Sequence, residues 1–451
     1  MSSTASSAEL NVVVVGGGLV GALVASFFAK RGHRVRLYEY RSDVRVECSR
    51  GVSIDLALSH RGREALRAVG LEDEVVNHHG TAMKGRMLHF RDGSLKEVLY
   101  DSVNGNCIYS VNRTHLNKLL LSAAEKHPNV SLFFKHKLID ADLDKGTLKF
   151  IKNESREIVN TEADLIIGAD GAYSLIRRMM SKRPRFDFNQ KYIDHGYVEL
   201  SYPRGKDDKY IMSGKHLHIW PRGEFMMIAL PNDDLTFTGN IFAPFKTLES
   251  LNTPERLLKF YREQFPDALQ LIGEEKLLRD FFQTSPKTLI SIKCKPYHVG
   301  NKTLIIGDAA HAMVPFYAQG MNAGFEDVLL LDHLMELHEG NLDKVLPGFS
   351  DARCDDAHAI VDLAMYNYLE MRDLVAKKSF LARKYLDDAL NWLFPNNWIP
   401  LYSTVTFSRM RYCDCISNKA WQDKVIKRAV FCVGIAILAV VTAAMISSVQ
   451  I

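Results

Sequence analysis

The chain has 451 residues, with 57 Lys or Arg against 53 Asp or Glu and 47% hydrophobic residues. This balance excludes a disordered tail, a collagen and a disulfide-stapled miniprotein, because each of these classes requires a strong compositional bias. The formal net charge of +4 comes from basic residues scattered among acids, whereas nucleic-acid binders concentrate them in a stripe. We therefore expect a globular protein with a large core and no nucleic acid among its partners.

The cysteines and the N-terminus indicate a reducing compartment. The 7 cysteines are mostly isolated, and no pair has the spacing of a zinc knuckle. Cys413 and Cys415 are expected to be free thiols, because no second pair or histidine lies near them in the sequence. The segment MSSTASSAEL has neither a charged n-region nor a long apolar run, so we expect synthesis in the cytosol, and we expect no metal site.

The first forty residues predict a nucleotide-binding βαβ unit. Asn11–Val15 is a β-branched strand, Gly16–Gly21 (GGGLVG) is a tight turn, and Ala22–Lys30 has a helical pattern. The second strand, Arg34–Glu39, ends on an acid about twenty residues after the glycines. Glycines let the backbone approach a pyrophosphate, whose charge is met by helix N–H groups, and Glu39 would accept from ribose hydroxyls.

The next predicted elements continue this domain. A helix is expected from Asn112-Arg113 to just before His127, and strands over Val130–Leu138 and Leu148–Ile151. The buried strand Ala163–Gly168 then runs straight into Asp170-Gly171. The chain thus returns to the buried-strand pattern of its first segment.

A different pattern lies between residues 195 and 244. The short runs GYVELSY, LHIW, FMMIAL and FTGNIF are separated by turn residues, which predicts an inserted antiparallel sheet with substrate-facing strands. The buried-strand pattern returns at Thr303–Gly307, followed by a long helix from about Met321. The nucleotide domain is therefore expected to be discontinuous. We assign 8–185 and 285–372 to that domain, with 80–105 contributing to the substrate site, and 186–284 to the sheet domain.

The C-terminal segment has the composition of a membrane anchor. No residue from Ala429 to Val449 is charged, and the run matches the roughly 20 residues that a membrane-spanning helix needs. Lys424, Lys427 and Arg428 precede it, which places the bulk of the protein on the cytosolic side. We expect a helical region over 373–425 and a transmembrane anchor over 426–449, the alternative being a buried core helix. The basic flanks suit the mitochondrial outer membrane or the endoplasmic reticulum, and the residues alone do not separate the two.

Three motifs carry a family resemblance: GGGLVG at Gly16, GADGAYSLIR at Gly168 and GDAAHAMVPFYAQGMNAGFED at Gly307. In this order they resemble the single-component (class A) flavoprotein aromatic hydroxylases. The resemblance implies an α/β fold with a Rossmann-like FAD-binding domain of the p-hydroxybenzoate hydroxylase type. In that family the first motif binds the ADP part of FAD, the second serves FAD and the nicotinamide donor, and the third reaches the ribityl chain.

Longer stretches narrow the resemblance within this family. SIDLALSHRGR, HGYVELS, LHIWPR, FMMIALPN and MYNYLEMR, together with the apolar C-terminus, are similar to the members that hydroxylate L-kynurenine. This similarity covers almost the whole chain and implies a place in tryptophan catabolism at the mitochondrial outer membrane. Protein partners are not predicted.

The candidate cofactor residues follow from the motifs and the resemblance. Asp308 can accept from a ribitol hydroxyl, and the helix beginning near Gly320 can stabilise negative charge on a reduced flavin. The alternative for Asp308 is a helix N-cap, and His311 is expected to be a structural histidine. The residues expected to bind FAD are Gly16, Gly18, Leu19, Val20, Gly21, Glu39, Tyr40, Arg41, Ala57, Arg113, Leu138, Asp170, Asp308, Gly320, Met321 and Asn322.

The candidate substrate residues match the chemistry of L-kynurenine. Its carboxylate requires a bidentate arginine, which by similarity is Arg86, and Glu370 is placed to meet the ammonium group. Without the resemblance, Arg86 and Glu370 would be solvated surface charges and Phe242 simple core. The residues expected to bind the substrate are Arg86, Tyr100, Asn367, Glu370, Tyr402, Phe242, Phe316 and Met371, of which Tyr402 closes the pocket and the last three hold the ring.

The resemblance also implies the reaction. A flavin C4a-hydroperoxide would carry the chemistry of forming 3-hydroxy-L-kynurenine from O2, so no side chain or metal is expected to be catalytic. The resemblance implies that NADPH acts as a transient co-substrate, and the absence of a second GxGxxG from the sequence agrees with this. One alternative is a membrane-bound FAD-dependent epoxidase or reductase acting on a lipid, whose site would lack the polar anchor. Another is a non-catalytic scaffold with a flavin fold.

Overall fold

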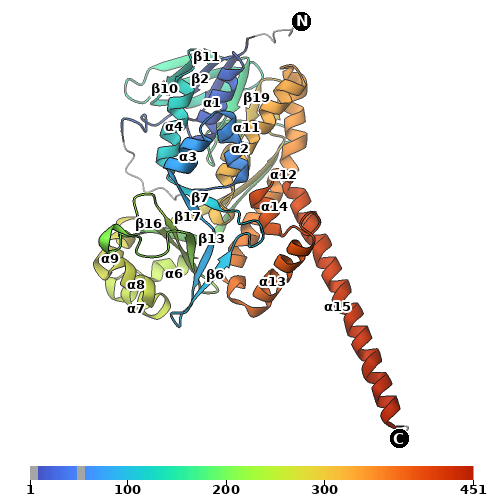
Figure 1. Cartoon of the computed structure of the whole chain (residues 1–451). Helices are drawn as coiled ribbons and strands as arrows, with labels where there is room; N and C mark the ends of the chain where they lie inside the picture. The colour runs from blue at the N-terminus through green and yellow to red at the C-terminus, as the bar shows by residue number, and fades with distance from the viewer. Residues whose placement is uncertain (1–8, 48–55, 450–451) are drawn as a thin grey trace.

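The computed structural model describes residues 9–47 and 56–449, with side chains described as far as 437. Two lobes lie one above the other in Figure 1, and the long helix α12 (Leu342–Arg372) runs from the upper lobe toward the lower part of the molecule. The helices that follow α12 lie beside the lower lobe, and the last of them projects away from the body. The two lobes meet where two strands from the first hundred residues, Gly85–His89 and Leu95–Leu99, join the sheet of the lower lobe.

A six-stranded sheet forms the centre of the upper lobe, in the order β18-β19-β12-β1-β2-β8. Its pairs are parallel except for β18–β19. The strands are β1 (Asn11–Val15), β2 (Arg34–Tyr38), β8 (Val130–Phe133), β12 (Leu165–Gly168), β18 (His298–Val299) and β19 (Thr303–Ile305). The valines of β1 are buried without alternation because the sheet is covered by helices and also by a three-stranded sheet, whose Phe150 stacks on Tyr38 with ring centroids 4.0 Å apart.

Helices pack against this sheet and against one another. Helix α1 starts at Leu19, three residues before the predicted Ala22, because the glycine turn already ends at its N-cap, Gly18. Helix α11 packs against α1, α2 and α12. The helices of this lobe are α1 (Leu19–Lys30), α2 (His60–Ala68), α3 (Glu72–His78), α4 (Arg113–Glu125), α5 (Leu175–Met180), α10 (Asp308–His311), η2 (Pro315–Tyr317) and α11 (Gly320–Leu337).

Two three-stranded sheets flank the upper lobe, in the orders β3-β7-β4 and β11-β10-β9. The prediction of one strand over Val130–Leu138 is wrong, because Lys135 adopts a positive φ of 58° and separates β8 from β9, which belong to different sheets. The strands are β3 (Leu56–Leu58), β4 (Gly80–Met83), β7 (Ile108–Val111), β9 (His136–Asp142), β10 (Thr147–Lys152) and β11 (Ile158–Glu162).

A seven-stranded sheet, in the order β17-β13-β16-β15-β14-β5-β6, forms the lower lobe. The prediction of an antiparallel sheet needs correction, because β5 pairs with β14 in parallel and the sheet is mixed. This pairing brings a strand from the first hundred residues, with Arg86, beside the inserted strands. The strands are β5 (Gly85–His89), β6 (Leu95–Leu99), β13 (Asp187–Tyr202), β14 (His216–Pro221), β15 (Met226–Pro231), β16 (Phe237–Pro244) and β17 (Lys287–Lys295).

Short helices that the sequence patterns did not predict cover the outer side of this sheet (Figure 1). They are η1 (Lys206–Asp208), α6 (Phe245–Ser250), α7 (Pro254–Gln264), α8 (Pro266–Ile272) and α9 (Glu274–Gln283). Leu257, Tyr261 and Phe265 are fully buried and form one cluster with Trp220 of the sheet. Burial of these large side chains stabilises the lobe.

The C-terminal region is helical, with η3 (Leu374–Ala376), α13 (Lys378–Leu393), α14 (Leu401–Phe407) and α15 (Tyr412–Val449). Helix α15 packs against α12 and α14 near its start and extends beyond the body (Figure 1). Over the residues that the structure describes, no helix combines the length and apolarity needed to cross a membrane. The predicted anchor over 426–449 is thus unsupported by the structure, and its part over 438–449 lies outside the residues with described side chains.

Candidate active site

The glycine-rich turn between β1 and α1 is too tight for side chains at two positions. A Cβ on Gly16, whose φ is +106°, would overlap the Ala169 carbonyl oxygen, and one on Gly21 would overlap that of Gly16. In contrast, a Cβ on Gly18 would meet nothing within 4 Å. Glu39 accepts from the backbone N–H of Gly17 over 2.7 Å. The turn therefore holds the acid at the end of β2 next to the glycines.

Two cavities meet at this turn, and Gly18 lines both. The first has a volume of about 600 Å³ and includes the predicted residues Gly18, Glu39, Tyr40 and Arg41. The second has a volume of about 230 Å³ and includes Gly18, Leu19, Val20, Ala57, Arg113, Asp308, Gly320 and Met321. An elongated dinucleotide fits this pair of cavities, because the turn leaves open space at Gly18 where the backbone must approach a pyrophosphate.

Other predicted cofactor residues do not line these cavities. Asp170 accepts from the backbone N–H groups of Leu175 (2.7 Å) and Ile176 (3.3 Å), and burial raises the pKa of its carboxyl. Asn322 donates to the Ala57 carbonyl over 2.9 Å. Leu138 is a buried core residue of β9. Asp170 and Asn322 thus support residues that line the second cavity, whereas Leu138 belongs to the core.

The anchor predicted for the substrate carboxylate lies in a buried polar cluster. Arg86 on β5 donates to Glu370 over 2.7 Å and to Asn367 over 3.4 Å, and both partners lie on one turn of α12. Arg86 is only 6% exposed. Burial acts to lower the pKa of Arg86, but the Glu370 carboxylate outweighs it, so the pKa is raised and Arg86 stays charged.

Stacked tyrosines lie beside Arg86. The rings of Tyr100 and Tyr402 are parallel with centroids 4.9 Å apart, and Tyr317 continues the stack at 5.7 Å from Tyr402. The Arg86 guanidinium carbon lies 5.1 Å from the centroid of the Tyr402 ring. Burial raises the pKa of Tyr100 to about 12, so its phenol is neutral at physiological pH. Sequence reasoning missed Tyr317, although it follows Phe316 directly in the third motif.

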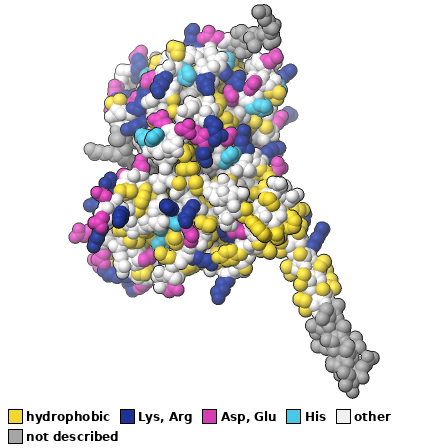
Figure 2. All heavy atoms as spheres, in the orientation of Figure 1, with side chains coloured by type: hydrophobic (Ala, Val, Ile, Leu, Met, Phe, Trp, Pro, Cys, Tyr) yellow, Lys and Arg dark blue, Asp and Glu magenta, His cyan; other side chains and the backbone are white. Residues whose placement is uncertain are grey.

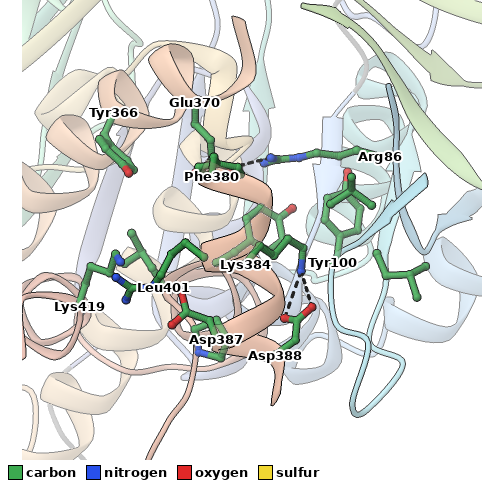
Figure 3. A pocket seen from close by; sticks show the side chains of 15 residues that line it. Arg86, Tyr100, Tyr366, Glu370, Phe380, Lys384, Asp387, Asp388, Leu401 and Lys419 are labelled. Atoms are coloured by element: carbon green, nitrogen blue, oxygen red, sulfur yellow. Dashed lines mark hydrogen bonds and ion pairs between the residues drawn. The ribbon is translucent and has the colours of Figure 1, made fainter. Parts of the chain in front are cut away.

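A third cavity, of about 150 Å³, is lined by Arg86, Tyr100, Glu370 and Tyr402 (Figure 3). Two polar atoms of these lining residues, the Arg86 Nε and the Tyr100 Oη, are buried and have no hydrogen-bond partner among the described residues. Donors of this kind suit a carboxylate ligand. The structure thus places four of the predicted substrate residues around one cavity.

The three residues predicted to hold the substrate ring do not line this cavity. Phe242 and Phe316 are buried against each other with ring centroids 4.9 Å apart, and Met371 is 1% exposed. Asn367 donates to the Phe316 carbonyl over 2.7 Å. Because Pro315 and Ala318 on either side of Phe316–Tyr317 line the second cavity, Asn367 connects the Arg86 cluster to a wall of that cavity.

A buried ionic cluster joins the third motif to the C-terminal region. Asp327 accepts from the Gly307 N–H (2.8 Å), from His311 (2.6 Å) and from Arg353 (2.7 Å). Burial acts to raise the pKa of Asp327, but the charges of His311 and Arg353 hold it below its usual value. His311 is thus a buried partner of Asp327, as expected for a structural histidine. The spacing in the sequence did not reveal Arg353.

The cluster extends to the start of α15. Arg353 also donates to Glu326 (2.8 Å), and Glu326 pairs with the buried Arg61. The Arg61 guanidinium lies 4.0 Å from the centroid of the Tyr412 ring, and the Tyr412 hydroxyl donates to Gln319 over 3.3 Å. Gln319 is the N-cap of α11 and precedes Gly320 at the second cavity.

Comparison with known proteins places the chain in a family. Residues 9–363 match the family model described as "FAD binding domain". The chain is 55% identical over 433 residues to a protein of Anopheles gambiae named kynurenine 3-monooxygenase, which covers 96% of this chain and 89% of the relative. The chain belongs to the kynurenine 3-monooxygenase family. A Sus scrofa family member of the same name is 46% identical over 425 residues, 94% of this chain and 89% of the relative.

Solved structures confirm the fold expected for a kynurenine 3-monooxygenase family member. The tetrameric form of 2-methyl-3-hydroxypyridine-5-carboxylic acid oxygenase has a TM-score of 0.66 at 22% identity and covers 83% of this chain and 95% of that chain. PqsL of P. aeruginosa, in complex with 2-aminobenzoylacetate, has a TM-score of 0.65 at 18% identity and covers 81% of this chain and 97% of that chain. Together they show a flavoprotein oxygenase fold with mixed sheets.

Proposed function

We propose that the chain is an FAD- and NADPH-dependent monooxygenase that hydroxylates L-kynurenine to 3-hydroxy-L-kynurenine. One O2 and one NADPH with a proton are consumed, and one oxygen atom enters the ring while the other leaves as water. The observation that carries this function is the Arg86, Glu370 and Tyr100 cluster at one cavity, in a chain whose relatives are named kynurenine 3-monooxygenase. These relatives favour this substrate over the lipid of the alternative interpretation.

The side chains bind and orient the substrate. Arg86 would meet the substrate carboxylate with the Nε that is not engaged by Glu370 or Asn367. The Glu370 carboxylate would exchange part of its contact with Arg86 for the substrate ammonium group. Tyr100, kept neutral by burial, would donate its hydroxyl to the carboxylate. The ring is expected to extend toward Phe316, beside the wall of the second cavity.

The residues around the two nucleotide cavities fit FAD, with Glu39 at the ribose end and Asp308, Gly320 and Arg113 at the other. When bound, FAD accepts electrons from NADPH and delivers an oxygen atom from O2 to the ring. The N-terminus of α11 at this cavity can stabilise negative charge. The protein's further tasks are to hold the reacting ring carbon in place and to exclude water.

The purified, flavin-loaded protein tests this function. NADPH consumption is measured with and without L-kynurenine, and the product is analysed by mass spectrometry. We expect faster NADPH consumption with L-kynurenine and a product heavier by one oxygen atom. If NADPH is consumed and only hydrogen peroxide appears, the substrate assignment is wrong while the cofactor assignment stands.

We infer in addition that α15 anchors the protein at the mitochondrial outer membrane, with the catalytic lobes in the cytosol. The support is the uncharged run Ala429–Val449 after basic residues, together with the exposed apolar side chains of Val430 (66%), Phe431 (68%) and Ile435 (52%). Figure 2 shows this apolar surface where the helix leaves the body. A chain ending at Arg428 should lose carbonate-resistant association with mitochondrial membranes, and association with the endoplasmic reticulum instead would contradict the location.

A further inference from the structure

The cavity at Arg86 extends away from the substrate cluster into a charged compartment that we call the vestibule. The vestibule is formed by Phe380, Arg383, Lys384, Asp387 and Asp388 of α13 and Lys419 of α15. Figure 3 shows Lys384 reaching toward Tyr100 with its ammonium group held by Asp388. The substrate residues and the vestibule residues therefore line one continuous space.

The charges of the vestibule are partly withdrawn from water. Lys384 and Asp388 are each 22% exposed and lie 3.0 Å apart, while Arg383 donates to Asp387 over 2.9 Å. Partial burial of a charge is costly unless the charge is paired, and i,i+4 pairs of this kind contribute little to helix stability. Because several of these ion pairs surround one cavity, we expect them to have a role other than stabilising the helices.

The pairing of these charges is incomplete. Lys384 pairs with Asp388, Arg383 pairs with Asp387 and Asp423, and Lys419 shares Asp423. The three cations are balanced only when Asp423, which does not line the cavity, is counted with Asp387 and Asp388. The Nη2 of Arg383 is nevertheless buried and has no hydrogen-bond partner among the described residues. Phe380 adds an aromatic wall. A compartment with exchangeable ion pairs, a free guanidinium donor and an aromatic wall suits an aromatic amino acid in its zwitterionic form.

We propose that the vestibule is a transit site through which the zwitterionic substrate passes, with Lys384 and Arg383 receiving its carboxylate and Asp388 its ammonium group before both reach Arg86 and Glu370. This inference rests on the proposed function, because it takes L-kynurenine as the ligand. Residues that contact a ligand only in transit change the rates of entry and exit by the same factor, because they do not contact it in the final complex. Their loss therefore leaves the equilibrium dissociation constant unchanged.

Stopped-flow measurement of flavin absorbance tests the proposal with the full-length, flavin-loaded protein in detergent. L-Kynurenine is mixed with wild type, Lys384→Met and Asp388→Asn in the absence of NADPH. We expect the association and dissociation rate constants of each variant to fall together by about tenfold, with Kd within about twofold of wild type. The matched control is Lys377→Met, which removes the exposed i,i+4 pair with Asp373 just before α13 and outside the cavity.

Two analogues of L-kynurenine, each lacking one of its charged groups, test the roles of Lys384 and Asp388 separately. For the analogue of L-kynurenine without its carboxylate, Lys384→Met should bind at the wild-type rate while Asp388→Asn binds slowly. For the analogue without its ammonium group the order should reverse. A merely structural role would slow all three ligands alike.

The outcomes separate this inference from the proposed function. If wild type does not bind L-kynurenine, the proposed function fails and the transit role fails with it. If wild type binds but the variants have unchanged rate constants, or the control is slowed equally, only the transit role is overturned. A raised Kd with unchanged association would also overturn it, since the residues would then act in the final complex.

Discussion

Arg86 and Glu370 are 284 residues apart in the sequence, yet the guanidinium of one donates to the carboxylate of the other over 2.7 Å. Arg86 comes from β5 of the lower sheet, between β14 and β6, and Glu370 comes from the end of α12. The carboxylate keeps a buried cation charged at the place where the substrate carboxylate is proposed to bind. Both groups are thereby oriented before the substrate arrives.

Glu370→Gln should weaken the use of L-kynurenine without loss of the cofactor. The amide keeps the shape of the side chain and an acceptor for Arg86, but the substrate ammonium loses a charged partner, which is worth about 1.5–3 kcal/mol. We expect kcat/KM to fall roughly tenfold to a hundredfold, mostly through KM. Steady-state NADPH consumption measures this change. An equal loss for the analogue without an ammonium group would contradict the assigned role.

Gly18→Ala and Gly16→Ala should differ in an informative way. A Cβ at Gly18 meets no atom of the protein within 4 Å but projects where two cavities join, whereas a Cβ at Gly16 overlaps the backbone of Ala169. We expect Gly18→Ala to lower FAD affinity at least tenfold while the apoprotein keeps its Tm. Gly16→Ala should lower both the FAD affinity and the Tm of the apoprotein. Flavin fluorescence titration and thermal unfolding measure the two effects, and a normal FAD affinity in Gly18→Ala would show that the dinucleotide lies elsewhere.

Arg353→Met should destabilise the fold strongly. The guanidinium is 3% exposed and donates to Glu326, Asp327 and Asp356, so its loss leaves buried carboxylates without a cation. Removing one partner of a buried ion pair costs about 3–5 kcal/mol of unfolding free energy. Urea unfolding of the apoprotein measures this cost. The control Arg262→Met removes an exposed pair with Glu274 and should change stability by less than about 1 kcal/mol.

Tyr412→Phe tests whether the start of α15 supports the cofactor cavity. The substitution removes the hydrogen bond from the Tyr412 hydroxyl to Gln319 and keeps the ring over Arg61. Loss of one buried hydrogen bond costs about 1 kcal/mol, so we expect FAD affinity to fall up to about fivefold. Fluorescence titration of the apoprotein with FAD gives this value. An unchanged affinity together with a lower Tm would assign Tyr412 to stability alone.

The stability of the lower lobe should decrease in acid because of His218. Burial lowers the pKa of His218 to about 3, and its ring contacts His89 over 2.8 Å. Between pH 6.5 and about 3 the unfolded chain therefore binds a proton that the folded chain does not. This contribution is fully present above pH 6.5 and is lost as pH falls, by up to about 1.4 kcal/mol per pH unit. His218→Asn should flatten the dependence seen in urea unfolding, whereas the exposed control His78→Gln should leave the dependence unchanged.

The parts of the fold that local patterns determine were predicted well. The βαβ unit at the N-terminus, the strand at Leu165–Gly168 and the helix from Gly320 are each determined by neighbouring residues, because burial periodicity and glycines act over a few positions. The family resemblance supplied Arg86, Asn367 and Glu370, and the residues alone would have left Arg86 and Glu370 as surface charges. The break at Lys135 was missed, since a positive φ at a lysine has no sequence signature.

Local residue patterns specified the nucleotide-binding turn and the succession of buried strands, and the family resemblance pointed to the arginine for a carboxylate. Which distant residues share a cavity depends on the tertiary packing. The parallel pairing of β5 with β14 places Arg86 opposite α12, and the packing of α13 brings Lys384 and Asp388 next to Tyr100. The physical reason is that periodicity specifies which face of an element is buried, whereas its partner is selected by packing and by the satisfaction of buried charges across the whole chain.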